Sequence, residues 1–336
     1  MLCHNSSSNI RNKIELADIF RKNIDKLPHI DIESWKVVNA IISCRTANLG
    51  GHVLKCDICG HEEYSYNSCR NRHCPKCQTL KKVKWLEARE DELLPVNYFH
   101  VVFTIPGFLN PIVLQNKKIA YDILFKSVKE TLLESAKTGK NLGADIGFIT
   151  ILHTWGQNLM DHPHIHCVVP AGGISPSGNN WKSCRNNYFI SIKILSKLFK
   201  GKFLDYLKKA FNSNELKFFG KIHNLKNKSC FQIIINRAYL KEWVVYAKKP
   251  FAGPKQVLDY IGRYTHRVAI SNNRIHSMEN DKVSFSWKDY SEDNKQKVMS
   301  LEVSEFMRRF LLHVLPKRFV RIRFFGFLAN KVKNDK

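Results

Sequence analysis

The stretch GFITILHTWGQNLMDHPHIHCVVP, residues 147–170, decides the fold that we expect. Its two ends, 147–155 and 164–170, are short runs rich in β-branched and aromatic residues. Runs of this length and composition are typical of β-strands. We therefore expect two strands here, joined by a short loop, as part of a central antiparallel sheet.

Three histidines mark the second of these strands. Side chains alternate along a strand, so His162, His164 and His166 are expected to point to one face. A lone histidine is usually structural, whereas three imidazoles on one face are typical of a metal or phosphate site. This face is therefore the candidate reaction site.

The composition favours a polyanionic partner. Lys and Arg number 54 against 29 Asp and Glu in 336 residues, a net charge of +25, which favours nucleic acid or an anionic membrane surface. With 44% hydrophobic residues a packed core is expected, which excludes a wholly disordered chain. No apolar run approaches the roughly 18 residues of a spanning helix, and the N-terminus lacks the apolar stretch of a secretory signal. We expect a cytoplasmic, nucleoid-associated protein with no membrane partner.

Six of the ten cysteines fall between residues 44 and 77. Nothing points to the oxidising compartment that a disulfide framework needs, so metal ligation is the favoured interpretation. Cys56-x2-Cys59 and Cys74-x2-Cys77, fourteen residues apart, have the spacing of two zinc knuckles and are predicted to bind one structural zinc ion. Four further soft ligands would complete a second zinc site, or they simply line the module: Cys44, His61, Cys69 and His73.

These elements predict an α+β fold, with a zinc-ribbon-like module followed by a central antiparallel sheet flanked by helices. Further strands are expected at 98–106, 229–237 and 282–290, where aromatic and β-branched residues gather. Helices are expected where apolar residues recur at helical spacing, at 13–45 with a break at Pro28, 83–94, 112–137, 191–211 and 254–267. The expected segments are 1–95 for the helical start and zinc module, 96–290 for the sheet domain and 291–336 for a basic C-terminal segment.

Two chemistries use a strand of this kind. In HUH nucleases a His-apolar-His pair holds a divalent cation and a tyrosine attacks a phosphodiester. In histidine-triad hydrolases and transferases the middle histidine attacks a nucleotide phosphate. Tyr260 and Tyr264 stand four apart in the expected helix LDYIGRYTHR, residues 258–267, so they share a face. That pair favours the nuclease, although two tyrosine rings packed in a core are an equally good interpretation of the pair alone.

Long motifs, in order, carry a resemblance to a known family. They are CRTANLGGH, CDICGH, YNSCRNRHCPKCQ, YFHVVFTIP, LHTWGQNLMDHPHIHCVVPAGG, YIGRYTHRVAISN and EFMRRFLLHVLPKRF with RIRFFGFLAN. From about residue 16 to 330 the chain resembles the insertion-sequence 91 family of bacterial rolling-circle transposases. Many members of that family continue beyond the FGFLAN motif, so we expect this chain to be a short or truncated member.

The resemblance implies an N-terminal zinc-binding domain and a two-tyrosine HUH nuclease domain. In that family pattern, Cys56, Cys59, Cys74 and Cys77 match the zinc ligands. His164 and His166 match the pair that holds Mg²⁺ or Mn²⁺, and Tyr260 and Tyr264 match the tyrosines that form 5′-phosphotyrosine intermediates. Single-stranded DNA at transposon ends and target DNA are the implied substrates. The third ligand of the catalytic cation is not fixed by the motif. We take it to be Gln157, with three rivals: His153, Asp161 and His162.

No GxxxxGK[ST] phosphate loop is present, so strand separation is expected to come from a host helicase, the replication machinery or supercoiling. Three alternatives to a transposase stay open. The first is a plasmid replication initiator or relaxase with the same HUH chemistry. The second is a histidine-triad nucleotide hydrolase or transferase, and the third is a zinc-dependent DNA-binding protein without catalysis.

Overall fold

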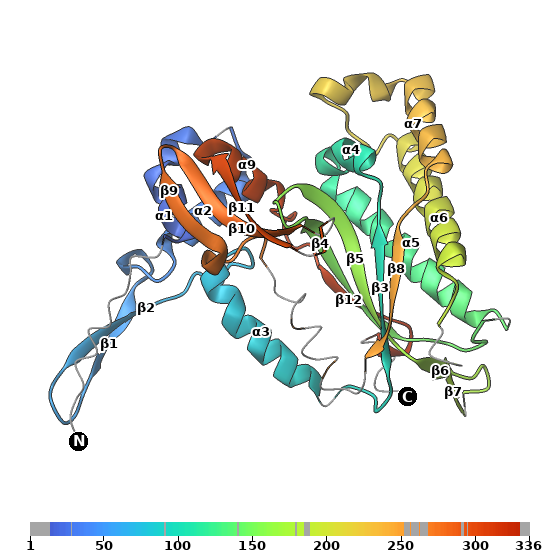
Figure 1. Ribbon diagram of the computed structural model, residues 1–336, viewed down its shortest axis with the longest axis horizontal. Coiled ribbons are helices and arrows are strands. Elements are labelled where there is room, and N and C mark those ends of the chain that lie inside the picture. Colours follow the sequence, from blue (N-terminus) through green and yellow to red (C-terminus); the bar gives the residue numbers. More distant parts are fainter. Residues whose placement is uncertain are drawn as a thin grey trace. The chain divides into compact units, whose positions relative to one another are not determined.

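Figure 1 shows the computed structural model, which describes residues 14–329 apart from 28, 91, 140, 179, 185–188, 252–255, 257–261, 263–267, 290, 291 and 294. The chain divides into two compact units. The first contains Met1–Lys81, Gly156–Met160 and Val268–Val314, and the second contains Lys82–Trp155, Asp161–Arg267 and Leu315–Lys336. Tyr260 and Tyr264, which belong to the helix expected at 254–267, lie outside the described residues.

The second unit is built on a five-stranded sheet in which every pairing is antiparallel, as expected. The spatial order is β12-β4-β5-β3-β8. The strands are β3 (Tyr98–Thr104), β4 (Phe148–Trp155), β5 (Asp161–Pro170), β8 (Val245–Phe251) and β12 (Ile322–Phe325). The two strands predicted at 147–155 and 164–170 are confirmed as β4 and β5, neighbours near the centre of this sheet.

The strand register divides the sheet into two faces. His164 pairs with His153 on β4 and with Thr104 on β3, and His166 pairs with Ile151 and Val102. Residues directly opposite one another point to the same side of a sheet. We call this side the histidine face.

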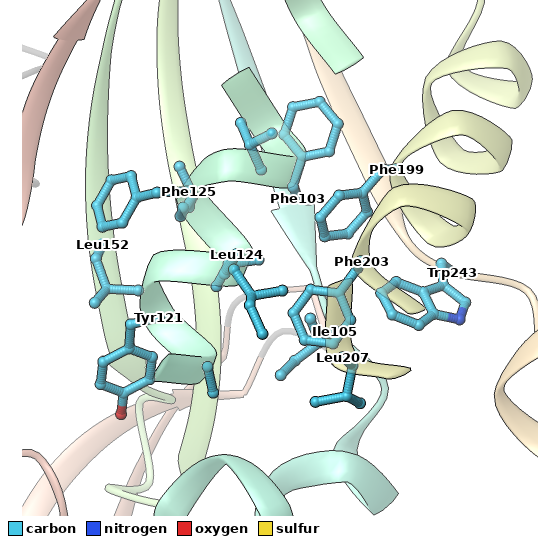
Figure 2. Packing of buried hydrophobic residues seen from close by; sticks show 14 of the residues in the cluster. Phe103, Ile105, Tyr121, Leu124, Phe125, Leu152, Phe199, Phe203, Leu207 and Trp243 are labelled. Carbon is cyan, nitrogen blue, oxygen red and sulfur yellow. The ribbon is translucent and has the colours of Figure 1, made fainter. Parts of the chain in front are cut away.

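The opposite face carries the main hydrophobic core. Helices α5 (Lys117–Lys137) and α6 (Ile192–Asn212) lie along it, as Figure 1 shows. Figure 2 shows the packing, in which Phe103 of β3 meets the edge of the Phe199 ring of α6 at 5.1 Å between centroids. The expected helix 112–137 is divided into α4 (Asn110–Gln115) and α5 by Asn116, whose side-chain amide donates to the carbonyls of Ile112 and Lys217.

The strand expected at 229–237 is wrong, because this segment lies in helix α7 (Lys228–Leu240). The Asn227 side chain caps the helix by accepting hydrogen bonds from the amides of Ser229 and Cys230. Phe231, Ile235 and Ala238 are buried, at the spacing of one helical face. Burial of that stripe outweighs the strand preference of the isoleucine run.

A smaller cluster covers one end of the histidine face. Trp85 of α3 (Pro75–Glu90) packs there with Tyr98, Ile151 and Phe324. A short hairpin, β6 (Gly172–Ile174) with β7 (Trp181–Ser183), completes the described part of this unit.

None of the described helices is both long and apolar enough to cross a membrane.

The first unit joins the beginning of the chain to residues 268–314. Its elements are α1 (Leu16–Lys22), α2 (Ile32–Ser43), β1 (Gly51–Lys55), β2 (Glu62–Tyr66), β9 (Ile275–Glu279), β10 (Lys282–Asp289), β11 (Lys295–Glu302) and α9 (Val303–Leu312). β1 and β2 form a hairpin, and the last three strands form a second sheet in the order β11-β10-β9. Phe20 of α1 meets the ring of Phe310 of α9 edge-on, with centroids 5.6 Å apart. The division at residues 95 and 290 stays a prediction.

Candidate metal centres

Three histidines converge at the centre of the sheet. His153 comes from β4, and His164 and His166 come from the neighbouring β5. One ring nitrogen from each lies within 4.8 Å of the others. All three side chains are buried, with at most 9% of the residue exposed. Burial in the middle of three hydrogen-bonded strands holds these rings in a fixed arrangement.

Hydrogen bonds fix the proton of His164. Its Nδ1 lies 2.6 Å from the carbonyl oxygen of His162, and a carbonyl can only accept. The single proton of the neutral ring therefore sits on Nδ1, and Nε2 keeps its lone pair. The Nε2 atoms of His164 and His166 face each other at 3.1 Å.

This separation fits a shared metal ion. With metal–nitrogen bonds of about 2.1 Å, two ligands at right angles place their nitrogens about 3.0 Å apart. The 3.1 Å between the two Nε2 atoms matches that value. Neutral imidazoles are common ligands of divalent transition metals, so the residues present fit such an ion.

A fourth histidine, His100 of β3, contacts this group. Its Nε2 lies 2.8 Å from Nδ1 of His166. Burial lowers the pKa of His100 to about 3, and the positive charge of Lys248 on β8 adds to the effect, so His100 is neutral at physiological pH. Sequence reasoning missed His100, because only the pairing of β3 with β5 brings it beside His166.

The structure distinguishes between the residues predicted as possible third ligands of the cation. His153 joins the histidine pair, whereas His162 is exposed and stands beside His164 without entering the group. The carboxylate oxygens of Asp161 are buried, and burial raises the pKa of this group to about 7. Gln157 lies in the β4–β5 loop, where its backbone carbonyl accepts a hydrogen bond from Arg274, and its role as a ligand stays a prediction.

The second centre is a cluster of four cysteines in the first unit. The sulfur atoms of Cys44, Cys69, Cys74 and Cys77 all lie within 4.8 Å of one another. The Sγ of Cys77 lies 3.5 Å from that of Cys44 and 3.6 Å from that of Cys69. Zinc–sulfur bonds of about 2.3 Å in a tetrahedron separate the sulfurs by about 3.8 Å, while a disulfide needs about 2.05 Å. The geometry therefore fits structural zinc.

The environment of this cluster calls for a cation. Burial raises the pKa of Cys44 to about 11. Hydrogen bonding to Cys69, followed by burial, raises the pKa of Cys74. A nearby positive ion favours the thiolate form of cysteine, and this is the role that zinc has in a site made of four cysteines.

The grouping differs from the predicted one. Cys74 and Cys77 are joined by Cys44 and Cys69, two residues assigned to the second site, rather than by Cys56 and Cys59. Cys56 and Cys59 lie in the turn of the β1–β2 hairpin, where hydrogen bonds from the backbone amides of Cys59 and Ile58 lower the pKa of Cys56.

The hairpin explains the difference. Its strands of five residues place the turn about 16 Å from the base of the hairpin. Cys44 precedes the first strand and Cys69 follows the second, so both lie on the side of the base. His61 and His73 are outside the cluster of four. Ligation by Cys56 and Cys59 stays a prediction.

Comparisons with known proteins point in one direction. A family model described as "Transposase zinc-binding domain" matches residues 16–105, and one described as "Putative transposase" matches residues 147–336. A protein of Sinorhizobium fredii, "Putative transposase y4qJ", is 51% identical over 326 residues, which cover 96% of this chain and 82% of that protein. "Transposase for insertion sequence element IS801" of Pseudomonas savastanoi pv. phaseolicola is 29% identical over 309 residues, 91% of this chain and 72% of that protein.

Proposed function

Because this chain belongs to the insertion-sequence 91 family of transposases, which carry an N-terminal zinc-binding domain, we propose that it nicks and rejoins single-stranded transposon ends. The proposed route is rolling-circle transposition through 5′-phosphotyrosine intermediates. The observation that carries the proposal is the convergence of three histidine nitrogens within 4.8 Å at the centre of an antiparallel sheet.

His164, His166 and His153 are the proposed ligands of a catalytic Mg²⁺ or Mn²⁺. The ion would stabilise the negative charge that develops on the oxygens of the scissile phosphate. The sheet contributes rigidity, since β4 and β5 supply all three ligands as hydrogen-bonded neighbours. Ligands held in place before the substrate arrives lose little entropy on binding.

Tyr260 and Tyr264 are the proposed nucleophiles. The tyrosine hydroxyl gives up its proton to solvent and its oxygen attacks the phosphorus, so that a new O–P bond forms as the bond to the 3′-oxygen breaks. The leaving 3′-oxygen takes up a proton from solvent. The products are a 5′-phosphotyrosine and a free 3′-OH. The energy of the phosphodiester is kept in the protein–DNA bond, so rejoining needs no ATP, and the second tyrosine allows one chain to hold two ends.

The cysteine cluster has a structural role in this proposal. Zinc at Cys44, Cys69, Cys74 and Cys77 would tie the end of α2, the base of the hairpin and the start of α3 together. Strand separation would come from a host helicase or from supercoiling, since the sequence offers no phosphate loop.

A covalent-adduct assay tests the proposal. The protein is incubated with labelled single-stranded ends of its own element and Mn²⁺, and protein–DNA bands are counted after denaturation. Wild type is expected to form an adduct, and the Tyr260→Phe, Tyr264→Phe double variant none. Tyr239→Phe, which changes an exposed tyrosine of α7, is the matched control and should behave as wild type.

The site of attachment separates the alternatives. An adduct that survives in the double variant places the nucleophile elsewhere, and an adduct on His164 identifies a histidine-triad enzyme. Binding without any adduct in wild type, with Mn²⁺ and cognate ends present, supports a DNA-binding protein without catalysis.

A further inference from the structure

We propose that His100 is a positioning residue for the metal site: its Nε2 accepts the Nδ1 proton of His166 and so leaves Nε2 of His166 for the ion. The inference deepens the proposed function and rests on its metal site. It concerns a side chain that is not itself a ligand, because its bonded nitrogen faces His166 and not the centre of the group.

The argument begins with the proton of His166. A neutral imidazole carries one proton, on either nitrogen. Nε2 of His166 faces Nε2 of His164 at 3.1 Å, so a metal bound between them takes the lone pair of Nε2. The proton must then lie on Nδ1, and a buried N–H needs an acceptor. Nε2 of His100, at 2.8 Å, is in position to be that acceptor.

The geometry of the two rings suits this bond. Their planes differ by 12° and their centroids are 5.1 Å apart. With nitrogens only 2.8 Å apart, rings in this arrangement lie edge to edge, so the N–H of one points at the in-plane lone pair of the other. The strand register explains why the two side chains can meet. His100 pairs with Val168 and is therefore the diagonal neighbour of His166.

The two β5 ligands are thus oriented in different ways. His164 donates to a backbone carbonyl, which no substitution removes. His166 depends on a side chain, and a neutral histidine can either donate or accept at Nε2. Without metal, His100 can donate to His166 while His166 donates to His164. With metal, the rings of His100 and His166 each still hold one proton, and in both rings that proton sits on Nδ1.

Mn²⁺ affinity, measured by electron paramagnetic resonance on zinc-loaded protein, tests the inference. His100→Met and His100→Gln are matched in size, but only Gln retains an acceptor near the position of Nε2. We expect the Met variant to bind Mn²⁺ about 10–100-fold more weakly, the usual effect of losing the partner of a ligating histidine. The Gln variant should stay within about threefold of wild type.

Two further variants separate this inference from the metal site itself. His313→Met is the control, since His313 is also buried and bonds a backbone carbonyl, that of Leu159, in the other unit. It should leave Mn²⁺ affinity unchanged. His164→Ala should abolish binding at the site, and if it does not, the metal site and the inference both fail.

If His164→Ala abolishes binding while His100→Met binds as wild type does, only the inference fails. It also fails if Gln is as weak as Met, because loss of the acceptor would then not be the cause. A measurement on the unchanged protein applies even where a variant does not fold. With nitrogen-15 histidine and saturating Mg²⁺, a scalar coupling across the bond from Nδ1 of His166 to Nε2 of His100 is expected, and its absence overturns the inference.

Discussion

Asp161 stands three residues before His164, yet its carboxylate belongs to the other side of the sheet. Odd-numbered residues of β5, such as Ile165 and Cys167, lie in the main core, and the negative charge of Asp161 influences Tyr121 of α5. Among the described residues, neither carboxylate oxygen of Asp161 has a hydrogen-bond partner, and the same is true of the Tyr121 hydroxyl. Alternation along one strand thus separates a buried acid from the histidines beside it in sequence.

Asp161 should make stability depend on pH. Its pKa is raised from 3.8 to about 7 by burial. Below pH 3.8 the carboxyl is protonated in both states, and as the pH rises toward 7 only the unfolded chain ionises. The free energy of unfolding therefore falls across that window, by at most about 1.4 kcal/mol per pH unit, and levels off above it.

Asp161→Asn should remove this dependence. In thermal unfolding, the variant and wild type are expected to differ little near pH 4, and the variant should have the higher Tm at pH 8. Asp205→Asn, on the partly exposed side of α6, is the control and should show no such pH-dependent gain. A variant that is less stable than wild type at pH 8 would show that the carboxylate has a charged partner.

His166→Ala should separate cleavage from binding. The ligand acts through charge that develops at the phosphate, whereas affinity for DNA comes from the basic surface. Adduct formation is expected to be lost, while the Kd for single-stranded ends, measured by fluorescence anisotropy, should change by no more than about threefold. A parallel loss of binding would mean that the histidine group holds the DNA rather than acting on it.

The zinc module illustrates what sequence spacing can and cannot provide. The CxxC pairs indicated zinc correctly, and the second pair does lie in the cysteine cluster. The partners of that pair depend on the hairpin, which brings Cys44 and Cys69 together across 25 residues. Spacing rules treat the two nearest pairs as partners, and they carry no information about the five-residue ladder that lies between the pairs.

Zinc content should follow the grouping seen in the structure. Cys44→Ser and Cys69→Ser are each expected to lose zinc and to lower the Tm, because folding of so small a module depends on its metal. Cys56→Ser and Cys59→Ser should keep at least one zinc ion per chain by elemental analysis. The opposite pattern would restore the predicted set of Cys56, Cys59, Cys74 and Cys77.

Other elements also show that local sequence patterns can be predicted more readily than contacts between distant segments. β4, β5 and α6 could be predicted, because their patterns are local and continuous. The strand preference of its isoleucine run concealed helix α7, although the capping asparagine and the apolar stripe of this helix are also local signals. The contact of His100 with His166 requires two strands more than 60 residues apart, and no single motif contains it.

The whole molecule carries its positive charge unevenly. Between residues 189 and 251 there are fourteen Lys and Arg against three Asp and Glu. The C-terminal segment from Glu305 is also basic, but Arg308 and Arg309 both pair with Glu305. Their charge is therefore partly neutralised within α9, and exposed lysines such as Lys221 and Lys228 are the better candidates for phosphate contacts.

Affinity for single-stranded DNA should consequently depend strongly on salt. If about six phosphates are neutralised, the logarithm of the association constant should fall with the logarithm of salt concentration at a slope near −4. Changing Lys221 and Lys228 to Gln should make the slope shallower by about 0.7 for each phosphate that the protein no longer neutralises. Lys282→Gln removes a lysine already paired with Glu302, and it should leave the slope unchanged. Equal slopes for all these proteins would place the DNA away from the α6–α7 region, and a flat salt response in wild type would mean that the net charge of +25 does not serve DNA binding.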